Sequence, residues 1–226
     1  MRKTPLVNGE YYHVYNRGVD RRIIFEDRFD TERFFQSMIL FNCIEPIGSI
    51  FEQSFNKRNS NKLGGSTAKN EKLVEIVSFC LLPNHFHLIL KQCVEGGISE
   101  FMKRLGGYTW YFNNKYDRSG SLFEGRFKSI HINSNEYLLH VSAYVNLNDK
   151  VHKFGGSTSK LVRSSWGEYV HNTKKPAENM CSTDIVLGQF KNKKEYEIFA
   201  KSSLKEILKH KEEGKEEKEI NQMLLE

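Results

Sequence analysis

The chain has 226 residues, of which 38% are hydrophobic and 12% aromatic. This composition predicts a globular protein with a sizeable core and excludes a largely disordered chain. Its apolar runs are shorter than the roughly 20 residues that cross a membrane, and the first residues lack a secretory signal pattern. The cysteines Cys43, Cys80, Cys93 and Cys181 form no C-x-x-C pair, which argues against a zinc ribbon or a disulfide framework. We therefore expect a reduced, cytoplasmic protein with no membrane partner.

The formal net charge is +6 and the isoelectric point is near 9.0. Residues 191–226 hold nine lysines and nine glutamates, so the whole positive excess lies in residues 1–190. Many proteins carry a charge of this size without binding nucleic acid. The charge alone therefore does not decide for a polyanionic partner.

The first part of the chain predicts a strand followed by a helix. Residues 10–17 are rich in aromatic and β-branched residues and end at Gly18, which is typical of a strand and a turn. Residues 30–43 carry apolar side chains at helical spacing, with Asp30 or Thr31 as the N-cap.

The next part predicts a long loop and a hairpin. Residues 47–51 are consistent with a short strand, and the Gly-, Ser- and Asn-rich residues 52–71 indicate a long flexible loop. Residues 73–82 and 85–92 read as two strands, and the pair Pro83-Asn84 makes the turn between them.

Beyond the hairpin, the pattern predicts helix, strand and helix. Residues 98–116 form an amphipathic helix that Gly106-Gly107 weakens or kinks. A strand lies within 122–132, and a helix capped by Ser134 or Asn135 runs to about Asn148. The order β-α-β-β-α-β is the ferredoxin-like plan. We therefore expect an α+β protein whose antiparallel sheet carries helices on one face, followed by a further helix.

Three regions are expected along the chain. Residues 1–150 form the main domain. Residues 151–190 form a packed arm, with 160–170 as a short helix or arm, and then a linker. Residues 191–226 form a charged C-terminal helix, because Tyr196, Phe199, Leu204, Ile207 and Leu208 follow a helical stripe.

Two histidines stand at the start of the second hairpin strand. Alternate residues of a strand share a face, so His85 and His87 project together while Phe86 points to the other side. An H-x-H pair in a strand is more often structural than metal-binding, because imidazoles tolerate half-buried positions. The pair is therefore either a polar patch or half of a metal site.

The last predicted helix of the main domain carries a tyrosine and an amide in register. Tyr144 and Asn148 are four residues apart, which places them on one helix face, and His140 extends the same stripe. If this helix crosses the open face of the sheet, its side chains can meet the two imidazoles. Two histidines, one amide oxygen and open positions suit a divalent ion such as Mg²⁺ or Mn²⁺. The alternative is that Tyr144 packs against the sheet with its hydroxyl satisfied elsewhere.

Basic and aromatic residues alternate along the main domain. Taken one at a time, each of these residues is more simply explained as a surface charge or a core aromatic. As a set they predict a phosphate-tracking groove with stacking surfaces for single-stranded or hairpin DNA. The basic members are Arg17, Arg21, Arg22, Lys103, Arg104, Arg118, Arg126 and Lys128, and the aromatic ones are Tyr108, Trp110, Tyr111 and Phe123.

Five segments together resemble a known family. They are "YYHVYNRGVDRR", "LLPNHFHLIL", "FMKRLGGYTWYFNNKYDRSGSLFEGRFKS", "YVNLN" and "SSWGEY", which span about Tyr11 to Tyr169. The first and last are loosely specific, whereas "LPNHFH", "GSLFEGRFKS" and "YVNLN" in that order are highly specific. The chain is similar to the single-tyrosine HUH transposases, and most similar to the REP-associated tyrosine transposases.

The resemblance implies residue roles. His85 and His87 match the HUH pair of metal ligands, Tyr144 matches the nucleophile, and Asn148 takes the position of the third ligand. The family usually has proline after this "LN", whereas Asp149 stands here. His140, one turn before the tyrosine, is a candidate helper for proton transfer.

The resemblance also implies an activity. Residues 1–150 would form a catalytic domain that uses Mg²⁺ or Mn²⁺ to cleave and join single-stranded DNA near hairpins through a covalent 5′-phosphotyrosine. Within it, the loop 52–71 would be an insertion relative to shorter relatives. The protein would be bacterial or archaeal, nucleoid-associated, and a monomer or homodimer. Two alternatives remain open: a catalytically silent regulator that binds hairpin DNA or RNA, and a metal phosphoesterase that uses water as nucleophile.

Overall fold

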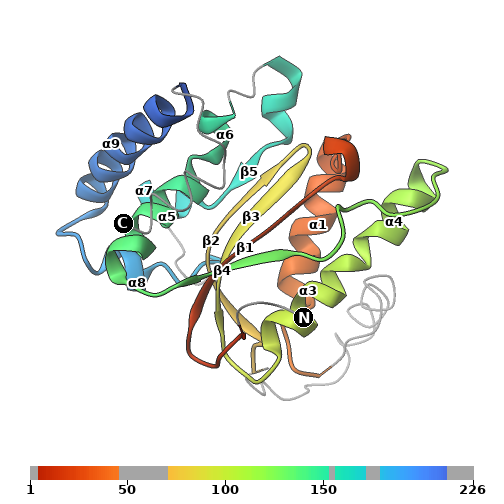
Figure 1. Ribbon diagram of the computed structural model, residues 1–226, viewed down its shortest axis with the longest axis horizontal. Helices are drawn as coiled ribbons and strands as arrows, with labels where there is room; N and C mark the ends of the chain where they lie inside the picture. Colours follow the sequence, from red (N-terminus) through yellow and green to blue (C-terminus); the bar gives the residue numbers. More distant parts are fainter. Residues whose placement is uncertain (1–4, 46–70, 153–155, 172–178, 213–226) are drawn as a thin grey trace, which may run out of the picture.

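A computed structural model describes residues 5–45, 71–152, 156–171 and 179–212. Within these residues the chain forms an α+β fold around one antiparallel sheet (Figure 1), whose strand order is β4-β1-β3-β2-β5. The predicted class and the antiparallel sheet are therefore confirmed. The strands are β1 (Tyr11–Arg17), β2 (Val74–Leu82), β3 (His85–Gln92), β4 (Lys128–Ile132) and β5 (Arg163–Ser164).

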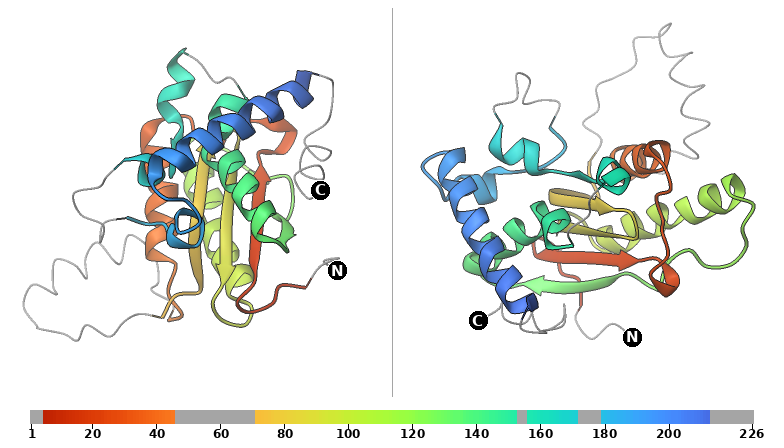
Figure 2. Two further views of the ribbon diagram at one scale, coloured as in Figure 1. Left: turned by 90° about the vertical axis from the view of Figure 1, so that its left-hand side faces the viewer. Right: turned by 90° about the horizontal axis from the view of Figure 1, so that it is seen from above.

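Helices cover both faces of the sheet, as Figures 1 and 2 show. One face carries α1 (Arg28–Leu40), α3 (Gly97–Gly106) and α4 (Tyr108–Lys115), and the other carries α5 (Asn135–Asn146) and α9 (Lys193–Glu212). The shorter helices are η1 (Val19–Arg21), α6 (Asn148–Val151), η2 (Gly156–Leu161), α7 (Trp166–Val170) and α8 (Asp184–Leu187). None of the helices in the described part of the chain is long and apolar enough to span a membrane.

The hairpin of β2 and β3 forms the centre of the sheet, with the predicted turn at Pro83-Asn84. Side chains alternate along β3: Phe86 and Leu88 join the core under α1 and α3, whereas Ile89 joins the core under α5 and α9. Both faces of β3 are thus covered. This explains why the segment reads as a nearly continuous apolar run with histidines in it.

The helix predicted over residues 98–116 is two helices. α3 ends at Gly106, Gly107 is the boundary residue, and α4 begins at Tyr108. A glycine pair has low helix propensity and allows the chain to change direction. The predicted strand 47–51, and all of the predicted loop 52–71 except residue 71, lie outside the described residues.

The N-cap of α1 is Asp27, and not Asp30 or Thr31 as the sequence predicted. The side chain of Asp27 accepts from Asp30 N at 2.9 Å, and Asp30 Oδ2 accepts from Asp27 N at 3.3 Å, which completes a capping box. Asp30 is fully buried and also accepts from Lys115 Nζ at 2.7 Å and from the Tyr116 hydroxyl at 2.7 Å. Asp30 therefore completes the cap of α1 as its third residue and also ties α1 to the end of α4.

The segments after residue 160 pack on the domain. β5 pairs with β2, Tyr169 of α7 is buried, and Val186 of α8 is buried within the stretch expected to be a linker. The predicted C-terminal helix is present over 193–212, and its Tyr196 and Ala200 are buried against α5. α9 thus covers the outer side of the helix that carries Tyr144.

Candidate active site

The sheet positions His85 and His87 beneath α5. Their rings lie 5.1 Å apart, and in the β1–β3 register Arg17 pairs with His85 and Tyr15 with His87. His13 lies two residues before Tyr15 on β1 and therefore points to the same face, and its Nε2 is 2.9 Å from His87 Nδ1. The three imidazoles therefore share one face, which is the face that α5 covers.

His85 is oriented by two neighbours. Its Nδ1 lies 2.6 Å from Asn84 Oδ1 and its Nε2 lies 3.3 Å from Asn148 Oδ1. Both partners are amide oxygens, which can only accept, so a neutral His85 ring can donate to one of them. When it donates to Asn84 over the shorter distance, the Nε2 lone pair faces the oxygen of Asn148, and a cation shared by these two atoms would be stabilised.

Tyr144 reaches the same place from α5. Its ring packs edge-on against His87, with centroids 5.5 Å apart at 85°, and against His13, with centroids 6.0 Å apart at 79°. The side chain is only 1% exposed. The structure therefore brings together two pairs of residues that are far apart in the chain: His85 and His87, and Tyr144 and Asn148.

Asn148 reaches His85 from a separate helix. α5 ends at Asn146, Leu147 has φ −111° and ψ 19°, and Asn148 begins the short helix α6. The predicted single helix is therefore broken one residue before the amide. The fully buried side chain of Asn148 nevertheless meets His85.

Two further histidines belong to the cluster, and sequence reasoning missed both. His13 contacts His87, and the ring of His152 lies 4.6 Å from that of His85 at 70°. The period of β1 puts His13 on the face of Tyr15 and Arg17, but only the pairing with β3 shows that this is the histidine face. His152 follows α6 and carries no local signal.

The environment keeps His87 neutral. Burial is the main cause that lowers its pKa well below the ordinary value, and positive charge on His13, His85 or His152 would lower it further. If His87 donates from Nδ1 to His13, its Nε2 is the nitrogen that would bind a metal ion. Such a hydrogen bond to the second ring nitrogen is how proteins commonly orient a metal-binding imidazole.

These donors fit a divalent cation held by two imidazoles and one amide oxygen. In the described residues, no group of three or more His, Cys, Asp or Glu side chains is arranged to hold a metal ion. The fit therefore rests on His85, on neutral His87 and on the oxygen of Asn148, whose Nδ2 has no hydrogen-bond partner in the described structure. Nitrogen and oxygen donors of this kind suit Mn²⁺ or Mg²⁺ with water or phosphate oxygens completing the shell.

A buried hydrogen-bond network holds the other side of α5. Asn146 Nδ2 donates to the Tyr196 hydroxyl at 2.9 Å, and Ser165 Oγ donates to Asn146 Oδ1 at 2.6 Å. Ser142 and Tyr196 hydroxyls lie 3.1 Å apart, and Phe79 N of β2 donates to Ser165 Oγ at 2.9 Å. Positions 142 and 146 lie nearly opposite Tyr144 on the helix. The network thus fixes the rotation of α5 that points Tyr144 at His87.

His140 is placed away from the imidazole cluster. Its Nδ1 lies 3.1 Å from Ser203 Oγ, and its ring centroid lies 5.1 Å from that of Phe199. Both partners belong to α9. These contacts of His140 support packing of the C-terminal helix, not a role beside the tyrosine.

Most of the basic residues predicted to contact DNA lie near one end of the sheet, and the others lie on α3 or after α4. Arg17 and Lys128 both pair with Glu124, and Arg22 lies 3.8 Å from Asp20. These side chains, with Arg21 and Arg126, are at least partly exposed near the end of the sheet where β3 begins. Lys103 is exposed and pairs with Glu100, and Arg118 donates to Asn113.

Two members of the predicted set serve the fold instead. Tyr108 is 4% exposed and its hydroxyl donates to Ile24 O at 2.7 Å. Arg104 donates to the carbonyls of Phe41, Cys43 and Ile44, the residues that follow α1. An aromatic ring and a guanidinium occupied in this way do not present a surface for a base or a phosphate.

We expect Arg104→Ala to lower the free energy of unfolding by about 2–3 kcal/mol, because hydrogen bonds to a charged group are lost and carbonyls are left unpaired. Urea denaturation checks this result. Binding of a single-stranded oligonucleotide should change less than twofold. Lys103→Ala, one residue earlier and exposed, is the matched control for stability. A loss of DNA affinity in Arg104→Ala without a loss of stability would contradict the structural role.

The fold and the cluster together define an α+β protein in which paired imidazoles on a sheet face a tyrosine on a covering helix. Residues 48–148 match the family described as "Transposase IS200 like". This segment contains His85, His87, Tyr144 and Asn148, and its match to the IS200-like transposase family confirms the resemblance seen in the sequence.

One solved structure similar to this chain is a REP-associated tyrosine transposase bound to a REP hairpin. It is 14% identical with a TM-score of 0.43, and the match covers 81% of this chain and 92% of that chain. No curated protein sequence matches the chain.

Proposed function

We propose that this IS200-like protein is a metal-dependent single-strand DNA endonuclease and strand-transferase that forms a covalent 5′-phosphotyrosine near a DNA hairpin. One observation carries the proposal: the ring of Tyr144 lies against His87 while Asn148 Oδ1 lies 3.3 Å from His85 Nε2. A nucleophile and three metal-binding atoms thus occupy one site. The order of β1–β4 supports the ferredoxin-like plan for the catalytic domain.

The reaction assigned to Tyr144 is an in-line displacement at phosphorus. The phenolic oxygen forms a bond to phosphorus, the bond from phosphorus to O3′ breaks, and in net terms the phenolic proton ends on the leaving O3′. The products are a 5′-phosphotyrosine and a free 3′-OH. Attack by another 3′-OH reverses the step and joins strands, so the energy of the bond is conserved.

His85, His87 and Asn148 are the residues that would hold a divalent cation. When bound, the cation withdraws negative charge from the phosphate and positions it for attack. Mg²⁺ and Mn²⁺ are both suited to these ligands. The residues themselves keep the site in order: Asn84 fixes the ring of His85, and His13 fixes the ring of His87.

The proposed substrate strand enters where β1 ends and β3 begins. Arg17 is the register partner of His85, and Arg21 and Arg22 follow it in the chain. These charges suit phosphates on either side of the scissile bond. Because Tyr144 is 1% exposed, DNA can reach its hydroxyl only when a covering segment moves.

The proposal is tested with end-labelled DNA hairpins that carry single-stranded flanks of random sequence. With Mn²⁺, we expect a protein–DNA adduct that survives denaturing electrophoresis, and EDTA should reduce its yield at least about a hundredfold, because the phosphate charge is then uncompensated. Failure to form an adduct with every member of the pool would contradict the proposal.

The same gel separates the two alternatives. Cleavage without an adduct would favour a phosphoesterase that uses water. Retarded DNA with neither cleavage nor adduct would favour a regulator that only binds hairpins. The presence of the complete set His85, His87, Tyr144 and Asn148 in one site argues against that regulator, because binding alone requires none of them.

A further inference from the structure

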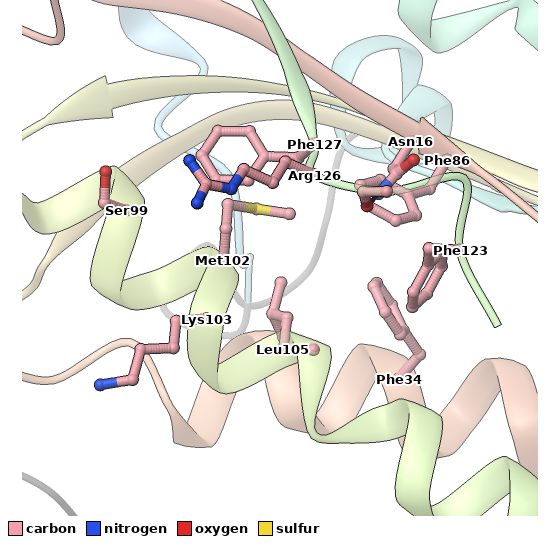
Figure 3. Close-up of a pocket in the computed structure, with 12 residues that line it drawn as sticks. Asn16, Phe34, Phe86, Ser99, Met102, Lys103, Leu105, Phe123, Arg126 and Phe127 are labelled. Carbon is pink, nitrogen blue, oxygen red and sulfur yellow. Dashed lines mark hydrogen bonds between the residues drawn. The ribbon is translucent and has the colours of Figure 1, made fainter. Parts of the chain in front are cut away.

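A pocket of about 260 Å³ lies on the sheet face opposite the imidazole cluster (Figure 3). Its floor consists of buried side chains from three elements, Phe86 of β3, Phe34 of α1, and Met102 and Leu105 of α3. Because Phe86 stands between His85 and His87 in the strand, the floor of the pocket is the reverse side of the candidate active site.

The walls are aromatic. The Phe86 ring lies 5.3 Å from that of Phe34 and 5.8 Å from that of Phe123, the second pair being edge-on at 83°. Figure 3 shows these three rings grouped at one end of the pocket, with Phe127 beside Met102 at the other end. Several flat apolar faces of this kind suit a planar ring more than a flexible chain.

The mouth of the pocket is polar and positive. Arg126 and Lys103 line it, both exposed, together with the exposed Ser99 and Gly125. Figure 3 places the guanidinium of Arg126 over Met102 and the ammonium of Lys103 pointing away from the interior. None of the described lining residues is acidic, and Arg126 has no salt-bridge partner in the described part of the chain. An apolar ring attached to a negatively charged group fits this combination.

We propose that this pocket binds one unpaired nucleobase of the DNA strand that is processed at the imidazole cluster, with the adjoining phosphate on Arg126; this rests on the function proposed above. The volume lies below the roughly 300–1,000 Å³ of sites for drug-sized molecules, so it accommodates one base and not a stretch of them. Base stacking on aromatic side chains with a basic rim is the usual way to hold single-stranded DNA.

The backbone joins the pocket to the site. Gly18, which follows β1, pairs with Phe123, and Glu124 N donates to Arg17 O at 2.9 Å. Arg17 projects to the face of His85, whereas Asn16 lines the pocket on the other face. A DNA strand that crosses this end of the sheet along Arg17 therefore has access to both faces.

The first test measures binding of single-stranded octathymidylate against an abasic octamer of equal charge. Both are measured without metal in Tyr144→Phe, so the result does not depend on cleavage chemistry. We expect the thymidine octamer to bind about tenfold or more tightly. Met102→Trp, which fills the pocket, should abolish that difference. Phe29→Trp, at a residue that is 78% exposed, should preserve it. Equal binding of the two octamers would overturn the proposal.

The second test does not depend on the fold tolerating a new tryptophan. Octathymidylate substituted with 5-iodouracil is photo-crosslinked to Tyr144→Phe protein, and the attached peptide is identified by mass spectrometry. We expect attachment at Phe123 or Phe127. Attachment confined to exposed aromatics such as Trp110, which is 74% exposed, would overturn the proposal, as would a pocket that binds apolar peptides and no DNA.

Discussion

Tyr144→Phe is expected to abolish the covalent protein–DNA adduct and to reduce strand cleavage at least about a thousandfold, a loss typical of removing a nucleophile. The variant deletes one oxygen and leaves the ring against His87 and His13, where the wild-type ring packs edge-on. Affinity for uncleaved single-stranded DNA should stay within about twofold. Denaturing electrophoresis measures the adduct, and a gel shift without metal measures the affinity.

Tyr137→Phe is the matched control. Tyr137 lies on the same helix, is 1% exposed and has a hydroxyl with no hydrogen-bond partner in the described structure. Its removal should leave adduct yield and cleavage unchanged. Adduct formation that persists in Tyr144→Phe, or that disappears equally in Tyr137→Phe, would show that the nucleophile is another group.

The sequence was informative about this site where the chemistry is local. Strand alternation placed His85 and His87 on one face, and helical spacing predicted that Tyr144 and Asn148 share one side, although the helix breaks at Leu147 between them. Both patterns depend on a period of a few residues. His13 could not be found in the same way, because its contact with His87 depends on the register between β1 and β3. His152 is likewise joined to His85 only by the path of the chain after α6.

Local spacing also failed to predict which basic and aromatic side chains are occupied within the fold. Arg104 and Tyr108 looked like members of a DNA groove because they alternate with other basic and aromatic residues along the chain. In the fold, Arg104 binds the carbonyls after α1 and Tyr108 binds Ile24. Local spacing cannot show which face of a broken helix turns inward. Tertiary packing decides that: Arg104 lies before the break at Gly107 and Tyr108 after it, and both make contacts within the fold.

The C-terminal helix α9 contributes Tyr196 to the hydrogen-bond network on the side of α5 opposite Tyr144. Tyr196 of α9 is fully buried, and burial raises the pKa of its phenol to about 12 even though bonds to Ser142 and Asn146 lower it. The phenol therefore stays protonated and donates to Ser142, whose own hydroxyl donates to Leu139 O. Asn146 of α5 also donates to the Tyr196 hydroxyl and accepts from Ser165 Oγ. Ser165 Oγ in turn accepts from the backbone N–H of Phe79 in β2. The helix stripe in the sequence predicted that the tail packs, but not that it holds the helix that carries Tyr144.

Asn146→Ala is expected to lower the free energy of unfolding by about 3–5 kcal/mol, because the buried hydroxyls of Tyr196 and Ser165 each lose a partner. It should also slow adduct formation about a hundredfold in the protein that stays folded, since a displacement of about 1 Å at a reacting group has an effect of that size. DNA affinity should change little, because Asn146 is fully buried.

A double-mutant cycle with Tyr196→Phe separates positioning from general destabilisation. If the two side chains act through their shared hydrogen bond, their effects on the rate of adduct formation are less than additive, with a coupling energy of about 0.5–3 kcal/mol. Single-turnover rates at saturating DNA and at a temperature where all four proteins are folded provide the measurement. Ser203→Ala, which removes the α9 contact to His140, is the control that loosens the same helix without touching the network. Additive effects, or an equal loss of rate in the control, would show that α9 stabilises the domain without orienting Tyr144.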